Sequence, residues 1–349
     1  MKNFENWWLS IDKLNFILIF SLGVTGVILS FSINESFTYI NRHTIFFIIG
    51  FILLIFFSNL DDKNIRRISL FGFLFLFILL LYVLRLDFEV KGAKRWIKFF
   101  NFTIQPSELI KPFFIILTAW CISQTINSKK NYLITLFIFF GALISLILLQ
   151  PDVGMTILFT STFFCQLFVA GLPLILVILA VIFLLIMSTS SYFIFDHVQR
   201  RINSFFESGD THQIDLSIRA FKSGGIFGKG PGQGILKEKI PDAKTDFIFS
   251  VAGEELGLIF CLIILLIILS IIIRTLIKVL KIQDPYKMIA ISGLICSFGL
   301  QSLINIFSSL GVIPTKGMTL PFVSYGGSSI ISISILFGFL LSLTNKNNE

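Results

Sequence analysis

Ten apolar runs follow one another along the chain, and polar segments separate most of them. Most runs approach the ~20 residues that a helix needs to cross a ~30 Å hydrocarbon layer. The pattern therefore predicts an all-α integral membrane protein with ten transmembrane helices in a single polytopic membrane domain, residues 1–349. The predicted spans are 14–31, 44–58, 68–85, 109–125, 132–149, 153–170, 172–193, 246–273, 286–310 and 320–343.

Composition and charge narrow the class of protein further. Of the 349 residues, 55% are hydrophobic and only 14% are charged, which is more apolar surface than a water-soluble core of this size can bury. A cytosolic enzyme is thereby excluded. The net charge of +8 comes from basic residues scattered between the spans, a pattern that argues against a nucleic-acid partner. The four cysteines and three histidines are too dispersed for a metal centre or a disulfide framework.

Ten spans would place the connections after spans three, five, seven and nine on one face of the membrane. These connections are 91–108, 150–154, the long loop 194–245 and 311–329. The connections on the other face consistently carry Lys and Arg, which predicts that this other face is cytoplasmic. Four cations of the outer face run against that rule, and an anionic headgroup in the outer leaflet would explain them. They are Lys91, Lys94, Arg95 and Lys98.

The segment QPSELIKP predicts a helix that begins with a charged pair. Pro106 suits a helix start because its missing N–H needs no partner there, and the Glu108 carboxylate suits the first turn. Lys111 follows three residues later on the same face, so the two side chains are expected to form an ion pair. The alternative to a functional role is a structural pair that orients the helix.

A second candidate is Asp246, at the mouth of the eighth predicted span, two residues after Lys244 and before an apparently uninterrupted apolar helix. Partial burial at a helix entrance can tune a carboxylate toward general-base chemistry. The alternative is an N-terminal helix cap. Glu254 and Glu255 lie deeper in the same predicted span, and we expect at least one of them to face a polar interior or a partner.

Two glycine-rich segments resemble phosphate loops in composition only. The run 224–234 matches no nucleotide-binding spacing, so we predict a tightly turned loop at the membrane surface. The segment SYGGSS, with Ser324, Gly326 and Gly327, would offer backbone N–H donors to an anion at a helix start. Close helix packing through small residues is an equally good explanation.

Five motifs in matching order, across nearly the whole chain, resemble the SEDS family of bacterial peptidoglycan polymerases. They are GAKRWI, QPSELIKP, QPDVG, PDAKTDFIFSVAGEELG and PTKGMTLPFVSYGGSS. The segment PTKGMTLP is more similar to the cell-division branch of the family than to the elongation branch. Lys94 departs from the family pattern, which often has Arg there.

The resemblance implies a ten-span polymerase that joins lipid II into glycan strands at the outer face of the bacterial cytoplasmic membrane, at the division septum. The essential aspartate of the family falls on Asp246, and its conserved Trp, Glu and Lys fall on Trp96, Glu108 and Lys111. The partners implied are lipid II, the growing glycan strand, membrane lipid, a class B penicillin-binding protein and regulatory division proteins.

Such a transfer needs a base for the acceptor hydroxyl and positive charge for the departing pyrophosphate. We assign Asp246 as general base, with Lys111, Lys94 and Arg95 as candidate phosphate contacts. Trp96, Glu108, Lys244, Ser324, Gly326 and Gly327 complete the expected substrate-binding set. One inverting displacement suffices, so no second carboxylate is required. A divalent cation, Mg or Mn, would assist at the pyrophosphate, although the sequence shows no dedicated metal cage.

Three alternatives share parts of this pattern: an elongation polymerase, a lipid II flippase and a non-catalytic division scaffold. A carrier with alternating access should show charged or broken-helix features near the midplane in both halves, whereas here the distinctive residues lie toward one end. A scaffold would tolerate replacement of Asp246.

Overall fold

The computed structural model describes residues 4–33, 37–86, 94–99, 102–127, 132–171, 212–315 and 317–345, with isolated residues between 175 and 203. The described part is nearly all helical, as predicted. Its helices are α1 Phe4–Ser10, α2 Lys13–Ser32, α3 Phe37–Ser58, α4 Asp62–Val83, α5 Pro106–Asn127, α6 Leu133–Leu149, α7 Val153–Val169, α10 His212–Gly224, the 3-10 helix η1 Leu236–Glu238, α11 Ile248–Val279, α12 Pro285–Ser309 and α13 Gly327–Leu343.

Nine of the ten predicted spans coincide with these helices. In the described part of the chain, six helices are long and apolar enough to cross a membrane, namely α2, α3, α4, α5, α11 and α12. Shorter apolar helices occupy α6, α7 and α13. The remaining predicted span, 172–193, lies mostly outside the described residues, so the count of ten stays a prediction.

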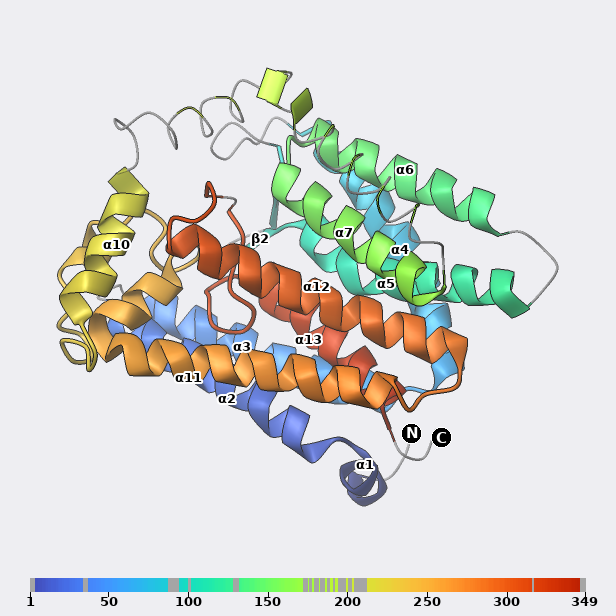
Figure 1. Ribbon diagram of the computed structural model, residues 1–349, viewed down its shortest axis with the longest axis horizontal. Coiled ribbons are helices and arrows are strands. Elements are labelled where there is room, and N and C mark those ends of the chain that lie inside the picture. The colour runs from blue at the N-terminus through green and yellow to red at the C-terminus, as the bar shows by residue number, and fades with distance from the viewer. Residues whose placement is uncertain are drawn as a thin grey trace.

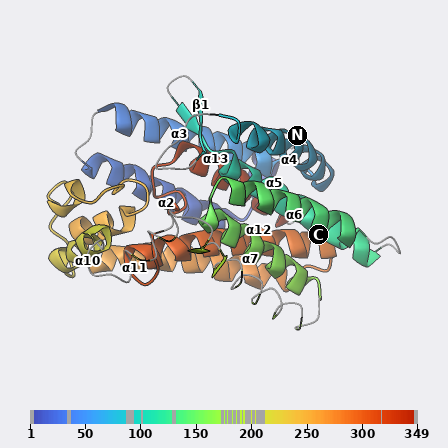
Figure 2. The same ribbon diagram turned by 90° about the horizontal axis from the view of Figure 1, so that it is seen from above.

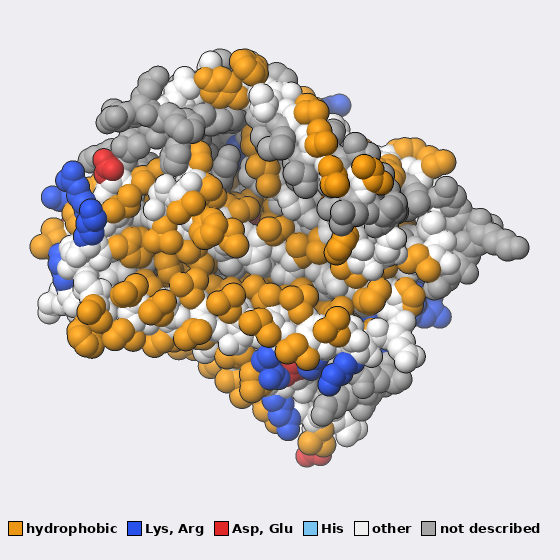
Figure 3. All heavy atoms as spheres, viewed as in Figure 1, with side chains coloured by type: hydrophobic (Ala, Val, Ile, Leu, Met, Phe, Trp, Pro, Cys, Tyr) orange, Lys and Arg blue, Asp and Glu red, His pale blue; other side chains and the backbone are white. Residues whose placement is uncertain are grey.

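Burial separates inner helices from outer ones. In α12, 72% of the most apolar stretch is buried and in α5 61%, against 28% in α4 and in α11. The outer helices expose Ile, Leu and Phe side chains, and apolar side chains cover much of the face shown in Figure 3. A helix with such an apolar exposed face is suited to lipid contact, so α5, α12 and α13 form the centre and α4 and α11 the lipid-facing surface. Figure 1 shows α11 and α12 running side by side along the length of the molecule.

The predicted long loop 194–245 is not irregular throughout. It contains α10 and η1, and α10 packs against the beginning of α11 at one end of the bundle. Figures 1 and 2 both place α10 at this end, running across the direction of α11. The expectation of an all-α chain also misses a short antiparallel hairpin, in which β1 Ile97–Phe99 pairs with β2 Phe102–Ile104.

The expectation that α11 runs without interruption is wrong. Gly257 has φ 77°, and a Cβ there would lie 2.4 Å from the Gly228 nitrogen and from the Ile226 oxygen. The glycine-rich loop fills the break, because Leu258 N donates to Gly225 O at 3.0 Å. A residue without Cβ is needed where the loop backbone approaches this closely.

Candidate active site

The predicted pair on α5 forms, and it is buried. The Lys111 ammonium lies 2.5 Å from Glu108 Oε2, and the two residues are 1% and 5% exposed. Pro106 begins α5 and Glu108 stands in its first turn, as predicted. The same ammonium donates to Gln301 Oε1 on α12 at 2.6 Å. A buried ammonium is tolerated only when its donors find acceptors, and here Glu108 and Gln301 both accept.

Gln301 connects the buried ion pair to the segment between α12 and α13. Its Nε2 donates to the Thr319 carbonyl at 3.0 Å, and Thr319 Oγ1 lies 2.6 Å from Ser329 Oγ on α13. Sequence reasoning missed Gln301. The available signal was an amide in the middle of an apolar helix, where an unpaired polar group is costly.

Asp246 lies in the turn that precedes α11. The helix begins at Ile248, and Phe247 occupies the N-cap position. Asp246 lies one residue earlier, so it is not the N-cap residue that the alternative explanation predicts. Its carbonyl accepts from Asn305 Nδ2 at 2.9 Å and from Ser309 Oγ at 3.4 Å. A Cβ on Gly317 would lie 3.8 Å from the Asp246 carboxylate, so the chain at Gly317 passes beside it.

The turn carrying Asp246 is held at three successive carbonyls. Tyr325 N donates to the Lys244 carbonyl at 2.9 Å, and Ser324 Oγ donates to the Thr245 carbonyl at 2.5 Å. The third is the Asp246 carbonyl bound by α12. Within the turn the amides of Thr245, Asp246 and Phe247 donate to the Asp242 carbonyl, and the contacts from distant segments satisfy the carbonyls, so the backbone is held through both kinds of group. Ser324 and Lys244, both predicted site residues, thus lie directly beside Asp246.

The Lys244 side chain points onto an aromatic group. Its ammonium lies 5.1 Å from the centre of the Tyr39 ring on α3, within cation–π range. The Tyr39 ring lies in turn 4.6 Å from that of Tyr325. Lys244 therefore links α3 to the segment that opens α13.

The two glycines of SYGGSS stand where α13 begins, with Gly326 in the cap position and Gly327 as first helical residue. A Cβ on Gly327 would approach the Phe46 ring of α3 to 2.6 Å. Glycine here lets the Phe46 ring of α3 pack directly on the start of α13, which favours the packing explanation. Anion binding by the backbone donors stays a prediction.

Arg95 binds the connection between α6 and α7. Its Nε donates to Gln150 O at 3.0 Å, its Nη2 donates to Pro151 O, and its Nη1 lies 3.7 Å from Asp152 Oδ2. Asp152 caps α7 by accepting from Met155 N at 3.2 Å. These contacts hold two of the recognised motifs, GAKRWI and QPDVG, against each other. Phosphate contact by Arg95 stays a prediction, as it does for its partly exposed neighbours Lys94 and Trp96.

Both deep glutamates have polar partners, as expected for at least one of them. Glu254 accepts from the backbone amides of Ile235, Leu236 and Lys237 at 2.9 to 3.0 Å. Glu255 Oε1 lies 2.6 Å from the Lys237 ammonium. The glycine-rich run is tightly turned, with positive φ at Gly225, Gly228, Gly230 and Gly232.

In the part of the chain that the structure describes, His, Cys, Asp and Glu side chains form no group of three or more that could hold a metal ion. Assistance by a divalent cation, Mg or Mn, at the pyrophosphate stays a prediction.

The fold and the site together define a multi-pass helical membrane protein with a carboxylate and a buried lysine near one end of its bundle. The model of the FtsW, RodA and SpoVE family of cell cycle proteins matches residues 3–349, and the chain belongs to this family. The probable peptidoglycan glycosyltransferase FtsW of Caulobacter vibrioides is 36% identical over 353 residues, which cover 97% of this chain and 90% of that protein.

Two solved structures share the fold. A chain of a peptidoglycan synthase complex superposes with a TM-score of 0.82 at 23% identity, covering 97% of this chain and 98% of that one. The rod shape determining protein RodA of Thermus thermophilus gives a TM-score of 0.70 at 22% identity, with 97% of each chain covered.

Proposed function

We propose that this protein is a peptidoglycan glycosyltransferase of cell division, which polymerises lipid II at the outer face of the bacterial cytoplasmic membrane. The observation that carries the proposal is the shared attachment of Lys111 and Asp246 to α12. Gln301 binds Lys111 and Asn305 binds the Asp246 carbonyl, and the two α12 residues are one turn, roughly 6 Å, apart. The relatives named FtsW support the chemistry and the role in division.

In this reaction Asp246 acts as general base. Its partly exposed side chain takes the proton of the acceptor sugar hydroxyl. The hydroxyl oxygen forms the new bond to the anomeric carbon of the donor. The bond from that carbon to the pyrophosphate oxygen breaks with its electron pair, and the configuration inverts.

We assign the predicted cations two different roles. Lys94 and Lys244 are partly exposed, and we propose that they stabilise the charge of the departing pyrophosphate. Lys111 is 1% exposed and already bound by Glu108 and Gln301, so its support for catalysis is to hold the site together. Arg95 similarly holds the turn between α6 and α7.

We also propose a class B penicillin-binding protein as partner, since the fold matches a chain of a peptidoglycan synthase complex. Regulatory division proteins would act on the pair at the septum. The growing glycan strand is the second substrate.

The test is polymerisation of labelled lipid II by the purified chain, with and without the transpeptidase, for wild type and Asp246→Asn. Asn keeps the size of the side chain and removes the base, so we expect ~10²- to 10⁴-fold slower synthesis from a protein with unchanged melting temperature. Asp284→Asn is the matched control, because Asp284 caps the far end of α12 and Asn caps equally well. Wild-type rates from folded Asp246→Asn would contradict the catalytic assignment.

A further inference from the structure

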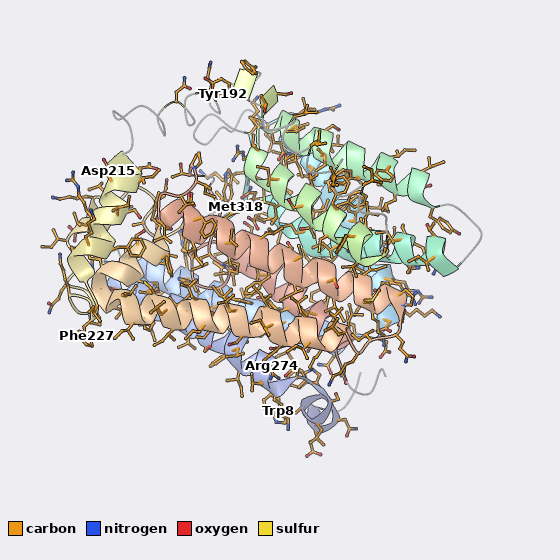
Figure 4. All side chains as sticks on the ribbon, viewed as in Figure 1. Trp8, Tyr192, Asp215, Phe227, Arg274 and Met318 are labelled. Atoms are coloured by element: carbon orange, nitrogen blue, oxygen red, sulfur yellow. The ribbon has the colours of Figure 1, made fainter. Side chains whose placement is uncertain are left out.

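Asn305 joins two segments of the candidate active site through one amide group. Its Nδ2 donates to the Asp246 carbonyl at 2.9 Å and to the Met318 carbonyl at 2.7 Å. Met318 lies beside the end of α12 in Figure 4. An amide nitrogen carries two hydrogens, so the single side chain satisfies both carbonyls.

The two carbonyls belong to segments that lie outside helices and strands. Asp246 lies in the turn before α11, and Met318 lies in the irregular segment between α12 and α13. Gly317, next to Met318, approaches the Asp246 carboxylate, since a Cβ there would be 3.8 Å from it. Asn305 binds a carbonyl of each segment, and together with Ser309 and Ser324 it fixes the position of the carboxylate relative to Gly317.

The bridge stands on a rigid and buried support. Asn305 is 1% exposed and lies on α12 between Gln301 and Ser309, each one turn away. Gln301 binds Lys111 and Thr319, and Ser309 binds the Asp246 carbonyl. One face of α12 thus contacts the buried ion pair, the Asp246 turn and the 317–319 segment.

We propose that Asn305 is a positioning residue, which sets the Asp246 carboxylate against the 317–319 segment for proton abstraction. The proposal rests on the proposed glycosyltransferase function. Asn305 acts through backbone carbonyls and is itself buried, so it has no contact with substrate. Displacement of a reacting group by about 1 Å can cost ~10²-fold in rate, which makes such a bridge consequential.

The experiment compares Asn305→Ala with Asn15→Ala in the lipid II polymerisation assay. Asn15 is the matched control because it is 0% exposed and its Nδ2 also joins two elements, donating to Thr275 Oγ1 at 3.3 Å. It lies at the start of α2, far along the chain from Asp246. For each variant we measure kcat, KM for lipid II, the pH profile of kcat and the melting temperature.

We expect Asn305→Ala to lower kcat by about 10- to 100-fold, with KM changed less than about twofold and an altered pH profile. Asn15→Ala should lower the melting temperature by a comparable amount and leave kcat and the pH profile of the folded fraction at wild-type values. If both variants keep the same kcat, or if Asn305→Ala changes KM alone, Asn305 is structural and the proposal is overturned.

A second variant keeps the test decisive if Asn305→Ala does not fold. Asn305→Ser retains one hydroxyl donor, which can serve one carbonyl but not both. If Asn305→Ala folds, a kcat of Asn305→Ser between those of wild type and Asn305→Ala supports the bridge. If Asn305→Ala does not fold, a kcat of Asn305→Ser at least about threefold below wild type supports it. A wild-type kcat of Asn305→Ser overturns the proposal. Failure of the proposed function is recognised separately, because the wild-type protein would then make no polymer.

Discussion

The Lys111 ammonium on α5 donates to Gln301 Oε1 on α12 across 2.6 Å, although the two residues are 190 positions apart in the chain. Both side chains are 1% exposed. Glu108 lies 2.5 Å from the same ammonium, so the ion pair within α5 also connects α5 to α12. Loss of any member leaves a buried donor or acceptor without its partner.

Glu108→Ala and Lys111→Ala are each expected to destabilise the protein by ~3 to 5 kcal/mol, since each leaves the opposite charge buried and unpaired. Gln301→Leu removes a neutral acceptor of the Lys111 ammonium and the donor to the Thr319 carbonyl, but it leaves no charge without its opposite, so it should cost less, about 1 to 3 kcal/mol. Melting temperatures and polymer yields of the three variants in the same detergent measure these effects.

The double variant provides the control for pairing. If Glu108 and Lys111 act as a unit, replacing both should cost less than the sum of the single losses. Strict additivity, or wild-type melting in either single variant, would argue that the pair contributes nothing.

Gly257→Ala should destabilise the protein, because a Cβ would enter the space of Gly228 N and Ile226 O at 2.4 Å and because φ 77° is unfavourable for alanine. The backbone strain alone is of order 1–3 kcal/mol. Gly141→Ala in α6 is the matched control. Among the described residues, no atom beyond its chain neighbours and its own helix backbone lies within 4 Å of the added Cβ. Alanine favours a helix by roughly 0.5–1 kcal/mol, so the melting temperature of Gly141→Ala should rise slightly.

The two glycine variants also test the break in α11 directly. A Gly257→Ala protein that melts at or above the temperature of Gly141→Ala would mean that α11 runs straight and that the glycine-rich loop does not fill a break.

Asp12 makes stability depend on pH. Burial raises the pKa of this carboxyl. The hydrogen bond and charge of Lys278, the Asn15 amide and the charge of Arg274 together lower the pKa by more than burial raises it, so the pKa lies below its ordinary value. Asp12 Oδ2 lies 2.7 Å from the Lys278 ammonium, and Figure 4 shows Arg274 toward the end of the molecule where α1 lies. A depressed carboxyl pKa contributes stability above the unfolded value of about 3.9, and this stability is lost as pH falls through the folded pKa.

Asp12→Asn keeps an acceptor for the cap of α2 and removes the charge. We expect it to cost about 1 kcal/mol or less at pH 7, because Lys278 and Arg274 are partly exposed, and to cost nothing once the pH is below the folded pKa of Asp12. Melting temperatures of both proteins between pH 7 and pH 3 measure the difference. A gap that widens as pH falls would reverse the sign of this argument.

The orientation in the membrane is tested by cysteine labelling. Cysteines at Lys94, Lys239 and Thr315 should react with an impermeant thiol reagent from outside intact cells, because all three stand in the connections predicted to be external. A cysteine at Lys281, in the connection after α11, should react only after the cells are opened. Labelling of a cysteine at Lys281 from outside intact cells would contradict the predicted orientation.

The sequence by itself determined the features that depend on neighbours along the chain. Apolar runs of sufficient length became helices, because a backbone in lipid must satisfy its own hydrogen bonds. Glu108 and Lys111 pair because residues three apart share a helix face. The family motifs identified Asp246 and the segments around it.

Only the tertiary structure decided which distant groups meet. Asn305 lies 59 positions from Asp246, Ser324 lies 79 from Thr245, and the glycine-rich loop folds onto Glu254 and Gly257. Helix periodicity reveals the polar face of α12 but not which carbonyls that face will bind, because the partner depends on how α5, α11 and α13 pack around it. The physical reason is that the crossing angle and the closeness of two helices decide which of their polar groups come within hydrogen-bond distance, and no local pattern of residues encodes these.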